Sequence, residues 1–153
     1  MKHKFLLDIN ILYYAVKGVD QNRHPDDTCV DLFKLIQLNC HTIRMDDVLL
    51  EKYKEHLAGL QRYRESVVES LRLVISLLQN SQKAVLEGGD PPDLPRGIRV
   101  PQKDEYVVRA ALVSRPTVVT CDGSLTRSIN EHSATLGFMA INPAEALQLA
   151  KET

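Results

Sequence analysis

The sequence predicts an α/β protein, a three-layer sandwich in which helices flank a parallel sheet of about five strands. Two patterns predict this fold. Short apolar runs typical of buried strands, such as residues 5–7 (FLL) and 117–121 (TVVTC), alternate along the chain with longer segments. In those longer segments the apolar residues recur at helical spacing. Strands that alternate with helices throughout a chain are typical of parallel sheets with right-handed crossovers.

A chain of 153 residues is expected to form one domain, residues 1–153, with a single core. Apolar residues make up 44% of the chain and charged residues 25%, which are the values of an ordinary globular protein. The formal net charge of −1 excludes a strong overall positive field. Bound divalent cations or local clusters of Arg and Lys would therefore have to attract a polyanionic substrate.

The three cysteines, Cys29, Cys40 and Cys121, lie apart from one another, in or beside apolar runs. They form neither a CxxC pair nor an even framework, which favours buried thiols in a reducing cytoplasm. Asp8 interrupts the stretch where a signal peptide needs an unbroken apolar segment. No stretch approaches the roughly 18 apolar residues that span a bilayer. We therefore expect a cytoplasmic protein with no membrane contact.

The first strand is expected at residues 4–7 (KFLL), and Asp8 ends it. A helix should follow directly, because the next apolar residues recur at helical spacing: Ile9, Leu12, Tyr13 and Val16. Ligands gather at the carboxyl ends of the strands in open α/β sheets, so Asp8 lies where a first strand would deliver a metal ligand. The alternative is that Asp8 or Asn10 only caps the helix.

After a polar turn, a second helix is expected from Pro25, a favourable first helical residue, to about Asn39. The alternating segment 40–45 (CHTIRM) predicts a second strand. Asp46 or Asp47 should then cap a third helix.

Helical patterning dominates residues 47–86. The third helix should run through Leu57, and Gly59 is a candidate break. From residue 60 to residue 86, apolar residues recur at spacings of three, four or seven, which predicts one long amphipathic helix or two shorter ones. This segment either covers the sheet or offers a surface to a protein partner. The segment 88–103 holds four prolines and three glycines, and we expect it to be a loop within the same domain.

The alternation of helix and strand continues to the end of the chain. A helix is expected over residues 104–114, a β-branched strand over 117–121, a weak helix over 124–131 and a last strand over 136–141. Pro143 should open a C-terminal helix.

Four carboxylates stand out by their positions. Asp8 and Asp122 each end a predicted strand, and Glu51 lies in the first turns of the helix after the second strand. Asp104 opens a helix whose apolar stripe lies three, four and seven residues on, so its side chain should face the sheet. Each acid alone has a local explanation, as a cap, a helix-dipole partner or a turn residue. A shared site explains all four at once.

Convergent carboxylates without a Cys or His cluster are hard oxygen ligands, which suit Mg²⁺ or Mn²⁺ rather than zinc. Without metal, such a cluster repels itself and raises at least one carboxyl pKa. The natural chemistry of such a site is phosphodiester hydrolysis.

In order and spacing these residues resemble the PIN domain nucleases. That family has an N-terminal strand leading into Asp-x-Asn, a Glu on a helix, an Asp that opens a later helix, and a Thr-x-Asp motif after a strand. The matching segments are LLDIN with Asp8 and Asn10, LLEKY with Glu51, KDEYVVRAAL with Asp104, and VVTCD with Thr120 and Asp122.

The resemblance covers nearly the whole chain and implies a five-stranded parallel sheet, endoribonuclease activity, and a divalent ion at the strand ends. It implies that the Mg²⁺ or Mn²⁺ would be held by the four acids, with Asn10 and Thr120 supporting them by hydrogen bonds. The sequence departs from the family where many members carry a further acid, because Gly123 and Ser124 stand there. This departure argues against a full two-metal site.

Other charged residues near the four acids could either contact the substrate or have an ordinary structural or surface role. Arg44 and Arg109 are candidates for contacts to substrate phosphates, with solvated surface as the alternative. Among the spare acids, Asp46 and Asp47 are assigned to helix capping and Glu105 to a solvated face.

The primary hypothesis is a Mg²⁺- or Mn²⁺-dependent endoribonuclease acting on single-stranded or looped RNA. Its size is compatible with the toxin of a toxin–antitoxin pair, so an antitoxin, another protein or a second copy in a homodimer are candidate partners. The alternative is a non-catalytic PIN-like module that binds RNA or protein through the same crevice. A receiver-like domain is less favoured, because the first strand ends on one acid instead of an acidic pair.

Overall fold

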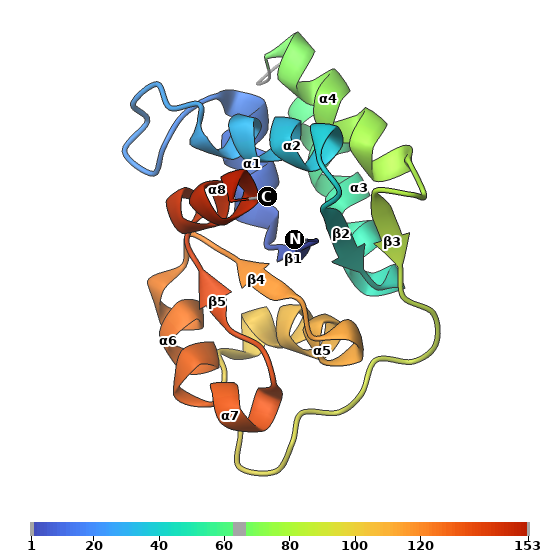
Figure 1. Cartoon of the computed structure of the whole chain (residues 1–153), viewed down its shortest axis with the longest axis vertical. Helices are drawn as coiled ribbons and strands as arrows, with labels where there is room; N and C mark the ends of the chain where they lie inside the picture. Colours follow the sequence, from blue (N-terminus) through green and yellow to red (C-terminus); the bar gives the residue numbers. More distant parts are fainter. Residues whose placement is uncertain (1, 63–66, 153) are drawn as a thin grey trace.

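Five parallel strands form one sheet in the computed structural model, which describes residues 2–62 and 67–152 (Figure 1). In chain order the strands are β1 (Lys4–Leu7), β2 (Thr42–Met45), β3 (Ala84–Leu86), β4 (Thr117–Val119) and β5 (Ala140–Ile141). They lie side by side in the order β3-β2-β1-β4-β5, and every neighbouring pair is parallel. The predicted α/β class and the five-stranded parallel sheet are confirmed.

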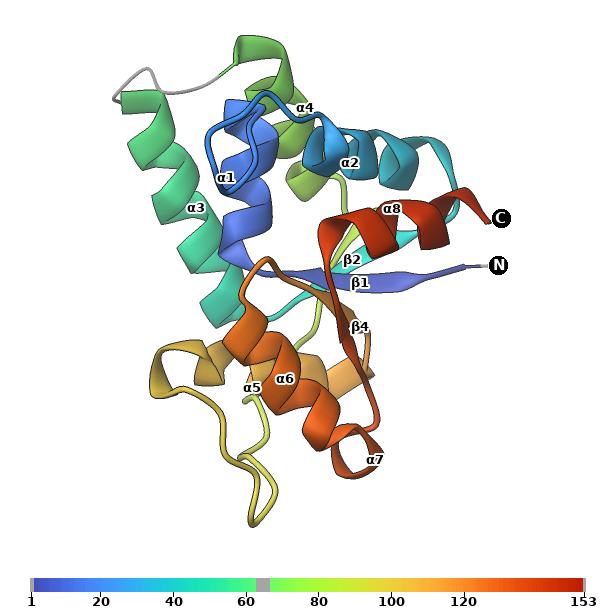
Figure 2. The same ribbon diagram turned by 90° about the vertical axis from the view of Figure 1, so that its left-hand side faces the viewer.

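Helices cover both faces of the sheet, as a three-layer sandwich requires (Figure 2). One face carries α1 (Ile9–Lys17), α2 (Thr28–Leu38), α4 (Val68–Gln79) and α8 (Pro143–Lys151). The other face carries α5 (Glu105–Ser114) and α6 (Gly123–Glu131), followed by the short α7 (Ser133–Leu136). The remaining helix, α3 (Asp47–Arg62), packs against both α1 and α5. It therefore bridges the two layers.

The core is centred on β1, whose three apolar residues are completely buried: Phe5, Leu6 and Leu7. Helix α5 contributes the stripe that its sequence predicted, because Val107, Val108 and Ala111 are also completely buried. A central strand that is buried on both faces has to be apolar throughout, which explains the short FLL run.

The register of the central strands decides which residues meet at the carboxyl edge of the sheet. Phe5 pairs with Ile43 of β2, and Leu7 pairs with Val119 of β4. The backbone N–H of Asp8 donates to the carbonyl of Val119 over 2.9 Å, which extends this pairing by one residue. The residues that directly follow β1, β2 and β4 therefore share one edge.

The second helix begins later than predicted. Instead of opening the helix, Pro25 forms an isolated antiparallel bridge with Val19, and α2 begins at Thr28. Oδ1 of Asp26 accepts hydrogen bonds from the backbone N–H and the hydroxyl of Thr28, at 2.8 and 2.6 Å. This local turn competes with the first helical turn, as Asp side chains often do.

The prediction of continuous helix over residues 60–86 is partly wrong. Helix α3 continues through Gly59, the candidate break, to Arg62, and α4 (Val68–Gln79) is the one helix that begins within the described part of this segment. Residues 63–66 of that segment lie outside the described residues. After α4 the chain turns at Asn80, whose Oδ1 accepts from the N–H of Gln82, and it then enters the sheet as β3. Apolar spacing cannot distinguish a three-residue strand from a last helical turn, which is why the pattern missed β3.

The last strand is shorter than residues 136–141, because Leu136 ends α7 and Gly137 adopts a left-handed conformation with φ 81°. The C-terminal helix begins at Pro143, as predicted. Asn142 and Glu145 form a reciprocal capping box at its N-terminus. Among the helices of residues 2–62 and 67–152, none has the length and apolar character needed to cross a membrane.

Candidate functional site

Asp8 is a nearly buried carboxylate at the junction of β1 and α1, with 5% of its surface exposed. Its Oδ1 accepts from the backbone N–H of Ile9 over 2.8 Å, so it caps α1. Its Oδ2 accepts from the Thr120 hydroxyl over 2.7 Å and from Asn10 Nδ2 over 3.2 Å. The capping explanation is therefore correct for one oxygen, while the second oxygen is bound by groups that belong to the edge of the sheet.

Thr120 and Asn10 connect the segment after β4 to the segment after β1. The hydroxyl of Thr120 donates to Asp8 and accepts from the backbone N–H of Asp122 over 3.0 Å. Asn10 Nδ2 lies 3.4 Å from the same hydroxyl oxygen, and Asn10 Oδ1 accepts from the N–H of Cys121 over 3.3 Å. These bonds hold the Thr-x-Asp segment in a fixed position relative to Asp8.

Asp122 caps α6 and also carries an ion pair. Its Oδ1 accepts from the N–H groups of Ser124 and Leu125, at 2.9 and 3.3 Å. Its Oδ2 lies 3.8 Å from Nζ of Lys103, and a quarter of the Asp122 side chain is exposed. One oxygen of Asp122 thus caps α6, and the other pairs with the ammonium group of Lys103.

Asp104 has no local explanation. It occupies the cap position of α5 but makes no side-chain capping bond, and 8% of its surface is exposed. Its Oδ2 is buried and has no hydrogen-bond partner. A buried carboxylate oxygen without a partner is energetically costly unless it is protonated or binds a cation.

The charges of neighbouring aspartates act on the carboxyl groups of Asp8 and Asp104. Burial and the charge of Asp122 raise the pKa of Asp8, against the lowering effect of its hydrogen bonds. Burial raises the pKa of Asp104, and the charges of Asp8 and Asp122 raise it further. Burial together with the charges of Asp8 and Asp104 raises the pKa of Tyr106 to about 12. These electrostatic effects connect Asp8, Asp104 and Asp122, and we call the three residues the aspartate cluster.

Glu51 lies outside the aspartate cluster. Its side chain is 66% exposed and pairs with Lys54 over 3.6 Å. The inner face of α3 is marked by Leu49 and Tyr53, and Glu51 lies two residues from each, about 200° around the helix. The spacing of the buried residues Leu49, Tyr53 and Leu57 is the sequence signal that places Glu51 on the opposite face of α3.

Lys52 and Asp46 are related to the aspartate cluster through two tyrosines, Tyr106 and Tyr53. Nζ of Lys52 lies 4.6 Å from the ring centroid of Tyr106, whose pKa responds to two of the cluster acids. Asp46 follows β2 as Asp8 follows β1, and both charges raise the pKa of the buried Tyr53 hydroxyl. Its Oδ1 caps α3 through the N–H of Leu49 over 2.8 Å, as predicted, whereas its Oδ2 is buried without a partner. The position of Asp46 directly after β2 is the sequence feature that could have indicated a role near Asp8.

The two arginines proposed to contact phosphates are engaged elsewhere. Arg44 pairs with Glu87 over 3.3 Å. Arg109 donates to the carbonyls of Pro91 and Pro92, at 3.1 and 3.0 Å, and pairs with Asp93 over 3.5 Å. Both arginines therefore bind residues of the segment that follows β3.

The aspartate cluster is not a complete metal site in this conformation. Within the described residues, no three His, Cys, Asp or Glu side chains are arranged to hold a metal ion. Still, the unpartnered oxygen of Asp104 and the mutual repulsion of the acids fit a divalent cation, for which carboxylate oxygens are the preferred ligands.

No protein-family model matches the chain, and searches of curated proteins and of solved structures find no significant similarity to it.

Proposed function

We propose that the protein is a Mg²⁺- or Mn²⁺-dependent endoribonuclease whose metal ligands are Asp8, Asp104 and Asp122. The observation that carries this proposal is the buried, unpartnered Oδ2 of Asp104 beside two further carboxylates that raise its pKa. Burying a charged oxygen without a partner costs free energy, and a bound cation would offset that cost. The sequence resemblance to PIN nucleases supports the same chemistry and the same acids.

The chain's own residues would orient the ligands. Thr120, Asn10 and the N–H of Ile9 fix both oxygens of Asp8, and the first turn of α6 fixes one oxygen of Asp122. A bound divalent ion would supply an activated water and would stabilise negative charge on the phosphate. Lys103 and Lys52 lie at the edge of the cluster, where an ammonium group can position a phosphate of the backbone.

A neighbouring cavity supports a single-stranded substrate. It has a volume of about 610 Å³ and is lined by residues that include Tyr13, Tyr14, Lys17 and Arg23. The two tyrosine rings meet edge to face at 5.3 Å, and Nζ of Lys17 lies 5.3 Å from the Tyr13 ring centroid. Both rings are partly exposed, and accessible aromatic rings beside cations are a common way to hold unpaired bases and their phosphates.

The biological role that we propose is that of the toxin in a toxin–antitoxin pair. An antitoxin, or another protein partner, needs an apolar surface. The structure offers a groove of about 230 Å³ between α3 and α4, lined by Leu50, Leu57, Ala58, Ile75 and Leu78 together with polar residues. Expression of the active protein alone should arrest growth, and Asp8→Asn should relieve the arrest. Equal toxicity of the two forms would contradict this role.

The decisive experiment is cleavage of a single-stranded RNA with Mg²⁺ or Mn²⁺ present. Wild-type protein should cleave, chelation should stop cleavage, and Asp8→Asn should abolish it while leaving the circular dichroism spectrum unchanged. Glu51→Gln is the matched control, since this carboxylate is exposed, and it should cleave like wild type. Cleavage by Asp8→Asn at the wild-type rate would overturn the assignment.

A non-catalytic PIN-like module is the second candidate, and three observations favour it. Glu51 points away from the cluster, Lys103 already pairs with Asp122, and Gly123 and Ser124 stand where many family members have an acid. Calorimetric titration with Mn²⁺ separates the two candidates. Absence of binding at millimolar Mn²⁺, together with RNA binding without cleavage, would favour the module.

A further inference from the structure

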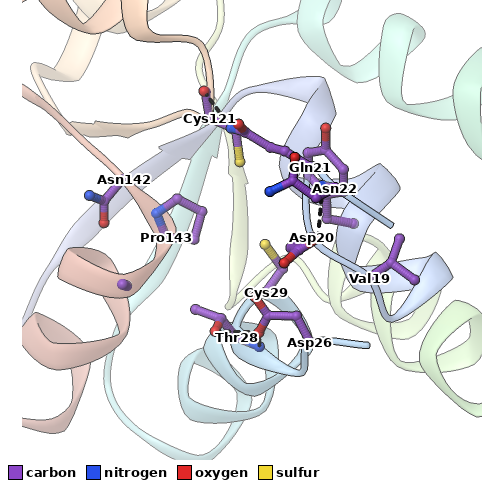
Figure 3. Close-up of a pocket in the computed structure, with 12 residues that line it drawn as sticks. Val19, Asp20, Gln21, Asn22, Asp26, Thr28, Cys29, Cys121, Asn142 and Pro143 are labelled. Carbon is purple, nitrogen blue, oxygen red and sulfur yellow. Dashed lines mark hydrogen bonds between the residues drawn. The ribbon is translucent and has the colours of Figure 1, made fainter. Parts of the chain in front are cut away.

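Two cysteines from distant parts of the chain line one pocket beside the aspartate cluster (Figure 3). The pocket has a volume of about 260 Å³ and lies between the segment 19–28, the start of α8 and the segment that follows β4. Its lining is rich in polar side chains: Asp20, Gln21, Asn22, Asp26, Thr28 and Asn142. Cys29 of α2 lines one side of it, and Cys121, the residue directly before Asp122, also lines it.

The two thiols are directed at each other. Figure 3 shows the sulfur of Cys121 pointing across the pocket toward the sulfur of Cys29. Their exposure differs: Cys29 is buried, with 6% of its surface exposed, whereas Cys121 is partly exposed. The Cys121 thiol is thus more accessible to a reagent in the pocket than the Cys29 thiol that faces it.

We propose that Cys29 and Cys121 form a redox-active dithiol that closes to an intramolecular disulfide when it reacts with a small polar disulfide of the glutathione type. A partly exposed attacking thiol that faces a buried resolving thiol across one pocket is the arrangement that such exchange requires. The polar walls of the pocket suit a peptide-like reagent. This site is separate from the proposed hydrolysis and does not depend on it.

The exchange balances without any further reagent. Cys121 gives its proton to solvent, and its sulfur attacks one sulfur of oxidised glutathione, which releases one glutathione thiolate and leaves a mixed disulfide. Cys29 then gives up its proton, and its sulfur attacks the Cys121 sulfur and displaces the second glutathione thiolate. The two cysteines lose two electrons and two protons, and one glutathione disulfide becomes two thiols.

Closure would tether the segment that carries Thr120 and Asp122 to α2. In the dithiol form that segment is held by hydrogen bonds, through the N–H of Cys121 to Asn10 and from Gln21 to the carbonyl of Cys121, at 3.3 and 2.8 Å. A covalent link between distant parts of a chain restricts the unfolded state, so the oxidised form should have a higher Tm.

The test is to incubate the whole protein with oxidised glutathione, block remaining thiols, and map peptides by mass spectrometry without reduction. We expect a linked Cys29–Cys121 peptide in monomeric protein, a mass loss of two hydrogens, and loss of two of the three titratable thiols. Reductant should restore the thiols and the lower Tm. Cys29 and Cys121 both still free, or a stable mixed disulfide on Cys121 with Cys29 free, would overturn the proposal.

Two variants sharpen the result. Cys29→Ala removes the resolving thiol, so Cys121 should accumulate as the mixed disulfide with glutathione. Cys40→Ser changes a cysteine at the surface and should still give the linked peptide. A linked peptide that contains Cys40, or a product that is a covalent dimer, would contradict the assignment. Since wild-type mapping needs no variant, the proposal is testable even if Cys29→Ala fails to fold.

Discussion

The hydroxyl of Thr120 donates a 2.7 Å hydrogen bond to Oδ2 of Asp8, joining the segment after β4 to the end of β1. The same oxygen accepts from the N–H of Asp122 over 3.0 Å. One buried hydroxyl therefore orients two acids that lie far apart in the sequence. It fixes the position of the segment that carries Asp122 relative to Asp8.

Thr120→Val should destabilise the fold by about 1–3 kcal/mol, because it leaves the buried Asp8 carboxylate and the N–H of Asp122 without this partner. Thr120→Ser keeps the hydroxyl and is the matched control. Urea unfolding of both variants measures the difference. Equal stability of the two variants would show that the hydroxyl contributes nothing to the junction.

Asp104→Asn should make the metal-free protein more stable at neutral pH. The pKa of Asp104 is raised in the folded state, so folding favours the protonated carboxyl. This contribution to the free energy of unfolding of wild type is fully present below the ordinary pKa of 3.8, and it is lost as the pH rises through the raised pKa. The asparagine has no charge to bury and loses no capping bond. The gain over wild type should therefore shrink as the pH falls toward 3.8.

Unfolding curves in chelator across this pH range test that prediction. Asp90→Asn, an exposed change in the loop after β3, serves as the control and should follow the wild-type profile. Parallel pH profiles for Asp104→Asn and wild type would contradict the electrostatic account of the cluster.

Mn²⁺ should raise the Tm of wild type and of Glu51→Gln equally, because Glu51 is exposed and pairs with Lys54. The increase should be much smaller in Asp104→Asn, which removes a cluster carboxylate. At a metal concentration one hundred times Kd, the expected stabilisation is about 2.7 kcal/mol. Differential scanning fluorimetry at several Mn²⁺ concentrations makes the measurement. If Glu51→Gln abolished the shift, Glu51 would have to turn inward when metal binds.

Tyr53→Phe should cost about 1–3 kcal/mol, since the buried Tyr53 hydroxyl donates to the carbonyl of Leu7, the last residue of β1. Removing the hydroxyl leaves that carbonyl unpaired directly beside Asp8. Tyr13→Phe, at a partly exposed ring, is the control and should change stability little. Chemical denaturation of both variants checks this, and equal values would exclude a structural role for the Tyr53 hydroxyl.

Local patterns in the sequence were sufficient for the fold class. The FLL and TVVTC runs predict buried strands, the apolar stripe of α5 predicts its inner face, and Pro143 marks the start of α8. Each of these signals reflects a preference that acts within a few residues, such as strand burial, helical periodicity or a fixed φ angle. Asp8 directly follows β1, as these signals predict, whereas β4 ends at Val119 instead of residue 121, so Asp122 is the N-cap residue of α6 and not the end of the strand.

Only the tertiary structure decided which acids share one cluster. Glu51 is excluded by the rotation of α3 about its axis, which packing of Leu49 and Tyr53 sets, while Asp46 approaches through the register of β2 on β1. The facing of Cys29 and Cys121 across one pocket likewise depends on how α2 docks near the end of β4. Helix rotation, strand register and docking are set by contacts between distant segments, and composition and periodicity do not encode them residue by residue.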